Sequence, residues 1–227
     1  MKSNAKYSLK LRSAPGDNGI TPLMLRKLSF KALSHLTRLF NFLLRSGHFP
    51  ASWKRAKVIP IPKPNKPCTD TNSYRAISLL SVLAKLFERI LATRLSSFVA
   101  QHHLLPHAQF GFRKKHSTVS QLARIADHVS NSYNLHKHSG MVLLDIEKAY
   151  DTVWIYGLLY KLITFKIPTY LLFILKASLD GRSFSIHLKE ATSPPKPPPL
   201  ACFKERFYRP PTLLSIFLIC RILLTHY

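Results

Sequence analysis

The sequence predicts an α+β protein in which helices pack on a small, mostly antiparallel sheet. Two patterns support this prediction. Apolar residues recur at helical spacing in several long segments, whereas Val58–Ile61, Met141–Leu144 and Arg182–Lys189 show the short apolar or alternating patterns of strands. Apolar residues make up 46% of the 227-residue chain, which is enough to form a hydrophobic core.

The chain is strongly basic. It contains 34 Lys and Arg against 10 Asp and Glu, which gives a formal net charge of +24. Such an excess predicts a polyanionic partner, either nucleic acid or an anionic membrane surface. Because the basic residues are spread through the apolar-periodic segments, we expect a positively charged groove on a folded domain rather than a basic arm.

Cysteine usage and the chain ends give no sign of an extracellular or membrane protein. Cys68, Cys202 and Cys220 form no C-x-x-C pair, so we expect neither a disulfide framework nor a zinc site, and a reducing compartment. The N-terminus has no apolar signal region. Leu213–Leu224 is apolar but shorter than the roughly 20 residues of a spanning helix, so we expect no membrane partner.

In the first half of the chain, residues 14–20 predict a turn because they contain Pro and Gly. An amphipathic helix between Leu25 and Leu43 should follow, ended by Gly47 and Pro50. A strand at Val58–Ile61 leads into a Pro-rich loop. The apolar stripe of Ser81–Phe98 predicts a second amphipathic helix.

The second half begins with a helix from Thr118, for which Thr118 and Gln121 form a capping box. Trp154–Lys176 should contain two helices divided by Pro168. The alternation in Arg182–Lys189 predicts a half-buried strand with Phe184, Ile186 and Leu188 on its inner face. The polyproline-type residues 193–199 should form neither sheet nor helix.

The central segment is V-L-L-D-I-E-K-A-Y-D-T-V, residues 142–153. Its apolar start predicts a buried strand at Met141–Leu144, which places Asp145 at the carboxyl end of that strand. A carboxylate at such an edge can face a cleft and hold a divalent metal ion. The alternative is an ordinary surface aspartate after a strand.

Three segments resemble the reverse transcriptases of jockey-like non-LTR retrotransposons. They are L-L-D-I-E-K-A-Y-D-T-V-W from Leu143, S-Y-R-A-I-S-L-L from Ser73 and Q-F-G-F-R-K-K-H-S-T from Gln109. The resemblance implies a partial right-hand polymerase fold with fingers and the first half of the palm. It divides the chain into an N-terminal segment (1–21), a fingers-like region (22–135), a partial palm (136–189) and a Pro-rich tail (190–227).

The resemblance also implies functions for individual residues. Asp145 would be the catalytic carboxylate and would bind Mg²⁺, or Mn²⁺, for two-metal nucleotidyl transfer. Tyr150 would lie under the nucleotide sugar and favour deoxynucleotides. The expected partners are an RNA template, a DNA primer and deoxynucleoside triphosphates, with no stable protein partner. Lys63, Lys66 and Arg75 are predicted to contact the triphosphate, and Gly111, Phe112, Arg113, Lys114 and Lys115 the template strand.

The chain departs from the family pattern after Lys189. No two adjacent Asp residues occur anywhere in the sequence, so the family's Asp-Asp block is missing. One hypothesis is a reading-frame shift, because codons for Q-G-A-V-L-S-P read one base later can encode the observed Lys204–Pro210. Three interpretations follow: a polymerase domain that is inactive alone, a non-catalytic remnant that binds RNA or RNA–DNA hybrids, or an unstable pseudogene product.

Overall fold

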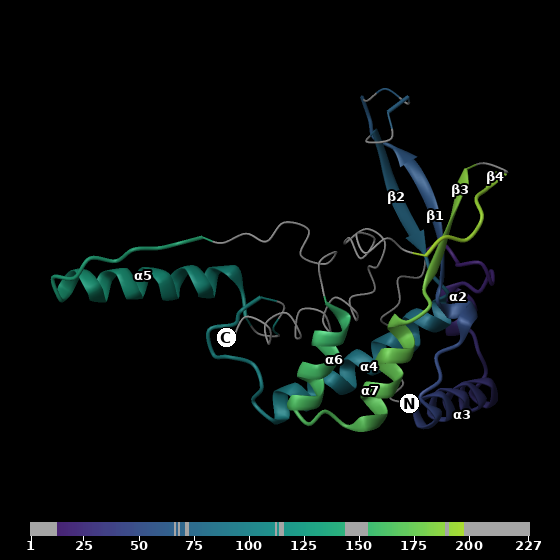
Figure 1. The fold of residues 1–227 in the computed structure, drawn as a ribbon, viewed down its shortest axis with the longest axis horizontal. Coiled ribbons are helices and arrows are strands. Elements are labelled where there is room, and N and C mark those ends of the chain that lie inside the picture. Colours follow the sequence, from purple (N-terminus) through teal and green to yellow (C-terminus); the bar gives the residue numbers. More distant parts are fainter. Residues whose placement is uncertain are drawn as a thin grey trace.

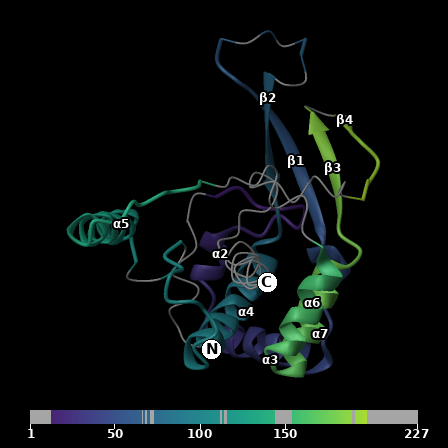
Figure 2. The same ribbon diagram turned by 60° about the vertical axis from the view of Figure 1, so that its left-hand side comes forward.

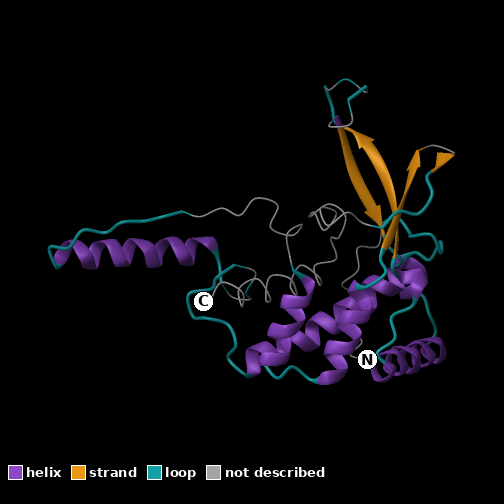
Figure 3. Ribbon diagram, viewed as in Figure 1, coloured by secondary structure: helices purple, strands orange, loops and turns teal. Residues whose placement is uncertain are grey.

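The computed structural model describes residues 13–65, 67, 69–70, 73–111, 113, 116–143, 154–188 and 191–197. Within these residues the fold is α+β, as predicted: six α-helices and a four-stranded sheet. Figure 3 shows the strands together at one end, above most of the helices. The helices are α2 (Pro22–Arg26), α3 (Phe30–Ser46), α4 (Val82–Gln101), α5 (Thr118–Asn134), α6 (Ile155–Thr164) and α7 (Thr169–Leu179); the strands are β1 (Arg55–Pro62), β2 (Tyr74–Leu79), β3 (Ser183–Leu188) and β4 (Ala191–Thr192), with a 3-10 turn η1 (Ala51–Trp53) before β1.

The sheet has the strand order β2-β1-β3-β4. β1 pairs antiparallel with β2 and parallel with β3, and β3 pairs antiparallel with β4. The prediction of a mostly antiparallel sheet is therefore confirmed, as are the strands predicted at Val58–Ile61 and Arg182–Lys189. β2 was not predicted; in the structure its first five residues alternate between half-buried and exposed positions.

One hydrophobic core joins α3, α4, α6 and α7. Phe87 of α4 is fully buried, and the rings of Phe40, Phe49 and Trp53 surround it at centroid distances of 5.1–6.0 Å. The predicted helix at Ser81–Phe98 is confirmed by α4. In Figure 1, α4 runs behind α6 and α7, and α3 lies next to α7. No helix in the described residues is both long enough and apolar enough to cross a bilayer.

The first amphipathic segment forms two helices rather than the single helix that was predicted. Ser29 ends the continuity because its side chain accepts a hydrogen bond from the Ala32 amide and caps the start of α3. Gly47 ends α3 in the left-handed region with φ 63°, as its sequence position indicated.

Two other helix predictions had different outcomes. α6 and α7 are separated at Pro168, as expected. The helix after residue 117 is present as α5, but its cap was assigned wrongly. The Ser117 side chain accepts from the Ser120 amide at 3.1 Å, so Ser117 is the N-cap and Thr118 is already helical.

Two strand-related predictions were wrong in the described residues. Met141, Val142 and Leu143 are exposed and form no strand, because no other strand of the described chain lies beside them. Ile186 and Leu188 are also exposed, because β1, β2 and β3 extend beyond the helices (Figure 1), whereas Phe184 nearer the helices is partly buried against the core. The prediction for the Pro-rich segment agrees with the structure, because residues 193–197 form neither a helix nor a strand and Lys196 makes only an isolated bridge with Phe184.

Candidate nucleotide-binding face

The β1–β2 hairpin brings two of the predicted phosphate-binding residues together. Ile61 lies opposite Arg75, and beyond the ladder the Lys63 amide donates to the Ser73 carbonyl at 2.7 Å. Because side chains alternate along a strand, Lys63 and Arg75 lie on the same face of the hairpin. They occupy diagonal positions, for which the usual separation is about 7–8 Å.

Arg55 and Lys57 continue this face along β1, since they alternate with Ala56 and Val58. Ala56 and Val58 are buried on the opposite side of the strand, where Ala56 belongs to the hydrophobic core. We call Arg55, Lys57, Lys63 and Arg75 the cationic face. One side of β1 is thus fixed by packing at Ala56 and Val58, while its other side carries two of the four cations, Arg55 and Lys57.

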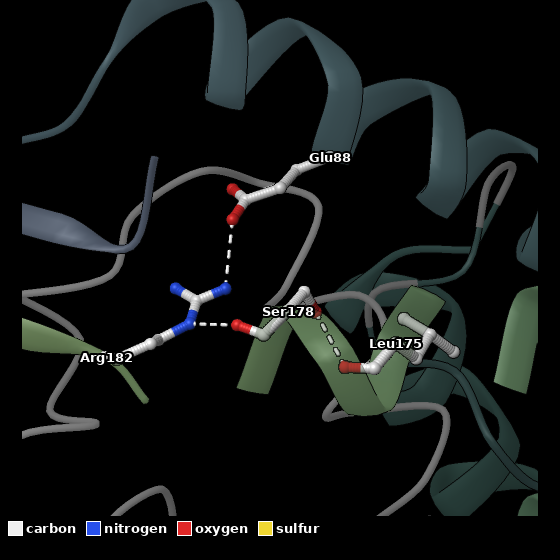
Figure 4. Close-up of polar contacts among 4 residues, drawn as sticks. All are labelled: Glu88, Leu175, Ser178 and Arg182. Carbon is white, nitrogen blue, oxygen red and sulfur yellow. Dashed lines mark hydrogen bonds and ion pairs between the residues drawn. The ribbon is translucent and has the colours of Figure 1, made fainter. Parts of the chain in front are cut away.

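A buried ion pair holds the sheet on the helices (Figure 4). Arg182, which precedes β3, donates from Nη2 to Oε1 of Glu88 on α4 at 3.1 Å, and both side chains are almost completely buried. Arg182 Nε also donates to the Ser178 carbonyl at the end of α7. The guanidinium lies 6.0 Å from the centre of the Phe49 ring. These contacts join α4, α7 and the start of β3 at one buried point.

Burial opposes the charge on Glu88, and the contacts of the ion pair offset this cost only in part. Burial raises the pKa of Glu88, and the nearby charges of Arg182 and Lys85 oppose that rise. Burial also lowers the pKa of Lys85, against the attraction of Glu88. Sequence reasoning missed this pair. The available signal was that Glu88 occupies the same helical stripe as Ala84, Leu91 and Leu95, where an acidic residue needs a buried partner.

The N-terminal turn fixes the junction between β2 and α4. A Cβ atom on Gly16 would come within 2.7 Å of both the Leu80 carbonyl carbon and the Ser81 amide nitrogen. The Asn18 side chain donates to Ser81 Oγ at 3.0 Å. Arg55 of the cationic face lines a hollow of about 250 Å³ beside this turn. The turn predicted at residues 14–20 is therefore a packed support for the hairpin.

The predicted template-contacting loop is distant from the cationic face. Gly111 and Arg113 lie between α4 and α5, whereas the hairpin joins the other end of α4, which at 20 residues is about 30 Å long. Arg113 Nη1 donates to the Pro106 carbonyl at 3.5 Å. A Cβ on Gly111 would meet only the flexible Gln109 side chain, so the described backbone does not require glycine there.

The remaining predicted site residues, namely Lys66, Phe112, Lys114, Lys115, Asp145 and Tyr150, lie outside the described residues. Within the described ranges, no group of three or more His, Cys, Asp or Glu side chains could hold a metal ion. In the part of the chain that the structure describes, the cationic face therefore has its supports, but no ligand set for Mg²⁺ or Mn²⁺ is formed.

Comparisons with known proteins agree on one family. Residues 61–194 match the family described as reverse transcriptase (RNA-dependent DNA polymerase). The chain is 37% identical over 190 residues to a probable RNA-directed DNA polymerase from transposon BS of Drosophila melanogaster, a match covering 83% of this chain and 21% of that protein. It is 36% identical over 214 residues to the RNA-directed DNA polymerase from mobile element jockey of the same fly, covering 94% and 23% respectively.

A more distant relative is the retrovirus-related Pol polyprotein from the type-1 retrotransposable element R2 of Popillia japonica. The chain is 32% identical to it over 142 residues, and the match covers 62% of this chain and 18% of that protein. The chain spans about a fifth of the length of the curated relatives it matches. The jockey match covers 94% of this chain, so the similarity extends past Lys189 into the Pro-rich tail. The frame-shift hypothesis for Lys204–Pro210 stays a prediction.

Proposed function

Because this chain belongs to the reverse transcriptase family, we propose that it acts within an RNA-directed DNA polymerase of a jockey-like non-LTR retrotransposon, and that its cationic face binds the triphosphate of an incoming deoxynucleotide. The observation that carries this proposal is the placement of Lys63 and Arg75 on one face of the hairpin, whose β1 strand is anchored on its opposite side by the buried Ala56 and Val58. In this proposal residues 22–135 correspond to fingers and residues 136–189 to the first half of a palm.

The chemistry of the face suits a triphosphate. Arg75 is exposed and can donate two parallel hydrogen bonds to phosphate oxygens, whereas Lys63 supplies a compact charge beside it. Arg75 lies within β2 and the Lys63 amide is hydrogen-bonded to the Ser73 carbonyl, so the backbone that carries both cations is positioned before the ligand arrives and loses little freedom on binding. Lys66 would add a third cation from the following loop.

The reaction itself depends on residues that the structure does not describe. We propose that Asp145 binds Mg²⁺, or Mn²⁺, and that Tyr150 packs under the sugar of the nucleotide. A bound divalent ion would supply charge neutralisation at the triphosphate and activation of the primer hydroxyl. Because the sequence has no adjacent Asp pair, we expect this chain alone to extend primers poorly or not at all.

Triphosphate binding can be tested directly on the whole chain. We expect Arg75→Ala to weaken the affinity for a deoxynucleoside triphosphate about tenfold, which corresponds to roughly 1.4 kcal/mol for one charge-assisted contact. Arg38→Ala is the matched control, because Arg38 is an exposed arginine on α3, away from the hairpin. Equal losses in the two variants, measured by calorimetry, would show that only net charge matters.

Primer extension on an RNA template tests Asp145 separately. If the chain incorporates deoxynucleotides, Asp145→Ala should abolish the incorporation, and persistent activity in that variant would defeat the assignment. The template and primer proposal predicts that the chain binds an RNA–DNA hybrid and that Arg113→Ala weakens this binding while leaving triphosphate affinity unchanged.

A second candidate function is non-catalytic binding of RNA or RNA–DNA hybrids. The net charge of +24 and the missing Asp pair favour it. Such binding should weaken steeply with salt, because each neutralised phosphate releases counterions. An affinity that does not change between about 50 and 200 mM salt would contradict any phosphate-based interface. This binding without triphosphate affinity would favour the second candidate over the first.

A further inference from the structure

The turn at residues 16–19 contains the one Asn-Gly pair of the sequence, Asn18-Gly19. The main-chain nitrogen that follows an asparagine can attack the side-chain amide and close a five-membered ring, and glycine has no side chain to hinder this attack. Both residues are exposed. In Figures 1 and 2, the purple segment that precedes α2 lies beside the base of the β1–β2 hairpin. A chemical change in this turn would therefore occur at a support of the cationic face.

Three hydrogen bonds hold the groups that would react. The Gly19 amide, which would attack, donates to the Gly16 carbonyl at 3.1 Å. The Asn18 side-chain nitrogen, which would leave, donates to Ser81 Oγ at 3.0 Å. Asn18 Oδ1 accepts from the Ile20 amide at 3.3 Å. Ring closure requires the Asn18 side chain to turn onto the Gly19 nitrogen, so the contacts with Gly16 and Ser81 must open first.

We propose that Asn18 is a deamidation site whose rate is controlled by the fold. The Gly19 nitrogen bonds to Asn18 Cγ, the bond between Cγ and Nδ2 breaks, and the Gly19 amide proton ends on the ammonia that leaves. Water then opens the succinimide ring at either of its two carbonyls, which gives aspartate or isoaspartate at position 18. The reaction needs water and no other co-reactant.

The contact with Ser81 can be removed without changing the start of α4. Ser81 is the N-cap residue of α4, but its side chain makes no capping hydrogen bond. The Ser81→Ala substitution therefore removes the acceptor for Asn18 Nδ2 and leaves the helix start as it is. One such hydrogen bond changes an equilibrium about fivefold. We expect Asn18 to deamidate about fivefold faster in folded Ser81→Ala than in the folded wild-type chain.

Both products of the reaction should weaken the support of the hairpin. An aspartate at position 18 has no N–H to donate to Ser81, and it adds a negative charge to the hollow that Arg55 lines. An isoaspartate lengthens the main chain by one atom, within a turn in which Gly16 already lies against the backbone of residues 80 and 81. We therefore expect the fully deamidated chain to unfold at a lower urea concentration than the fresh chain.

The first test compares the folded and unfolded wild-type chain at the same mildly alkaline pH. Peptide mass spectrometry follows the small mass gain that accompanies replacement of the Asn18 amide by a carboxylate. In concentrated guanidinium chloride, Asn18 should react fastest of all the asparagines, because it alone precedes glycine. It should react there about 25-fold faster than in the folded chain, since two protecting hydrogen bonds are absent.

The second test measures the rate in the Ser81→Ala chain. Ser96→Ala, on the exposed side of α4, is the matched control and should leave the rate at Asn18 unchanged. Circular dichroism shows whether Ser81→Ala keeps the fold; if it does not, the comparison of folded with unfolded wild type decides alone. Four results would each overturn the proposal: equal rates in the folded and unfolded chain, equal rates in the two folded variants, a faster asparagine elsewhere in the unfolded chain, or an unchanged urea midpoint after complete deamidation.

Discussion

The buried ion pair between Glu88 and Arg182 gives a prediction whose size follows from its surroundings. Arg182→Met removes the guanidinium and keeps a long apolar side chain in its place. Glu88 then remains in the core without its ionic partner. Because the two side chains are only 3% and 1% exposed, solvent cannot replace the lost contact. Breaking a buried pair in this way costs about 3–5 kcal/mol of unfolding free energy.

The loss should depend on pH. Burial already raises the pKa of Glu88, and Arg182 opposes that rise, so the pKa should increase further in Arg182→Met. A carboxyl group with a raised folded-state pKa binds more protons in the folded state than in the unfolded state. Stability of the variant therefore falls as pH rises from about 4.3, the unfolded Glu value, through the raised pKa. We expect a smaller loss at pH 5 than at pH 7.5.

Urea unfolding followed by circular dichroism at both pH values measures this effect. The double variant Glu88→Leu/Arg182→Met is the matched control, because it leaves no buried charge and should recover most of the stability. A loss below about 1 kcal/mol in Arg182→Met would refute the reasoning, because buried pairs lose more than surface pairs. So would a double variant as unstable as the single one.

Three other predictions concern local structure. Gly16→Ala should lower the free energy of unfolding in urea by about 1–3 kcal/mol, because its Cβ would contact the backbone of residues 80 and 81. Gly140→Ala is the control and should be neutral, because a Cβ there meets nothing within 4 Å. Equal effects of the two substitutions would contradict the close approach at Gly16. Ser117→Ala should speed amide hydrogen exchange in the first turn of α5 about fivefold, because losing the N-cap costs about 1 kcal/mol. Thr118→Ala is the control and should leave the exchange rate unchanged. The reverse result would restore Thr118 as the cap. In wild type, the raised pKa of Glu88 predicts that stability falls as pH rises from about 4.3 through that pKa, and Glu88→Gln should remove this fall. An unchanged slope would exclude Glu88 as its source.

Helices that the core covers were predictable from sequence, because their apolar spacing reports directly on burial. α4, and the division of α6 from α7 at Pro168, followed from this pattern. The break between α2 and α3 could not be predicted from this pattern, because the apolar repeat continues through it and the hydroxyl of Ser29 alone marks the start of α3. Local capping contacts of this kind compete closely, so periodicity alone does not resolve them.

For the candidate site, sequence identified Lys63 and Arg75, but it missed Arg55 and Lys57 and the arrangement of the four cations. Arg75 and Lys63 are separated by 12 positions along the chain, and only the register of β1 against an unpredicted β2 places them on one face. Glu88 and Arg182 were missed because each looks ordinary in its own segment. Their relation depends on the docking of β3 beside β1, which brings position 182 to the middle of α4.

The pairing of β1 with both a near and a far strand has a consequence for biosynthesis. β2 follows β1 almost immediately, so the hairpin can form as soon as it leaves the ribosome. The other edge of β1 pairs with β3, where Arg55 meets Ser183, and that strand emerges about 10 s later at ordinary translation rates. During this interval the nascent chain presents an open strand edge. Because an unpaired edge can pair with another chain, this interval is the stage at which the nascent chain is most open to aggregation.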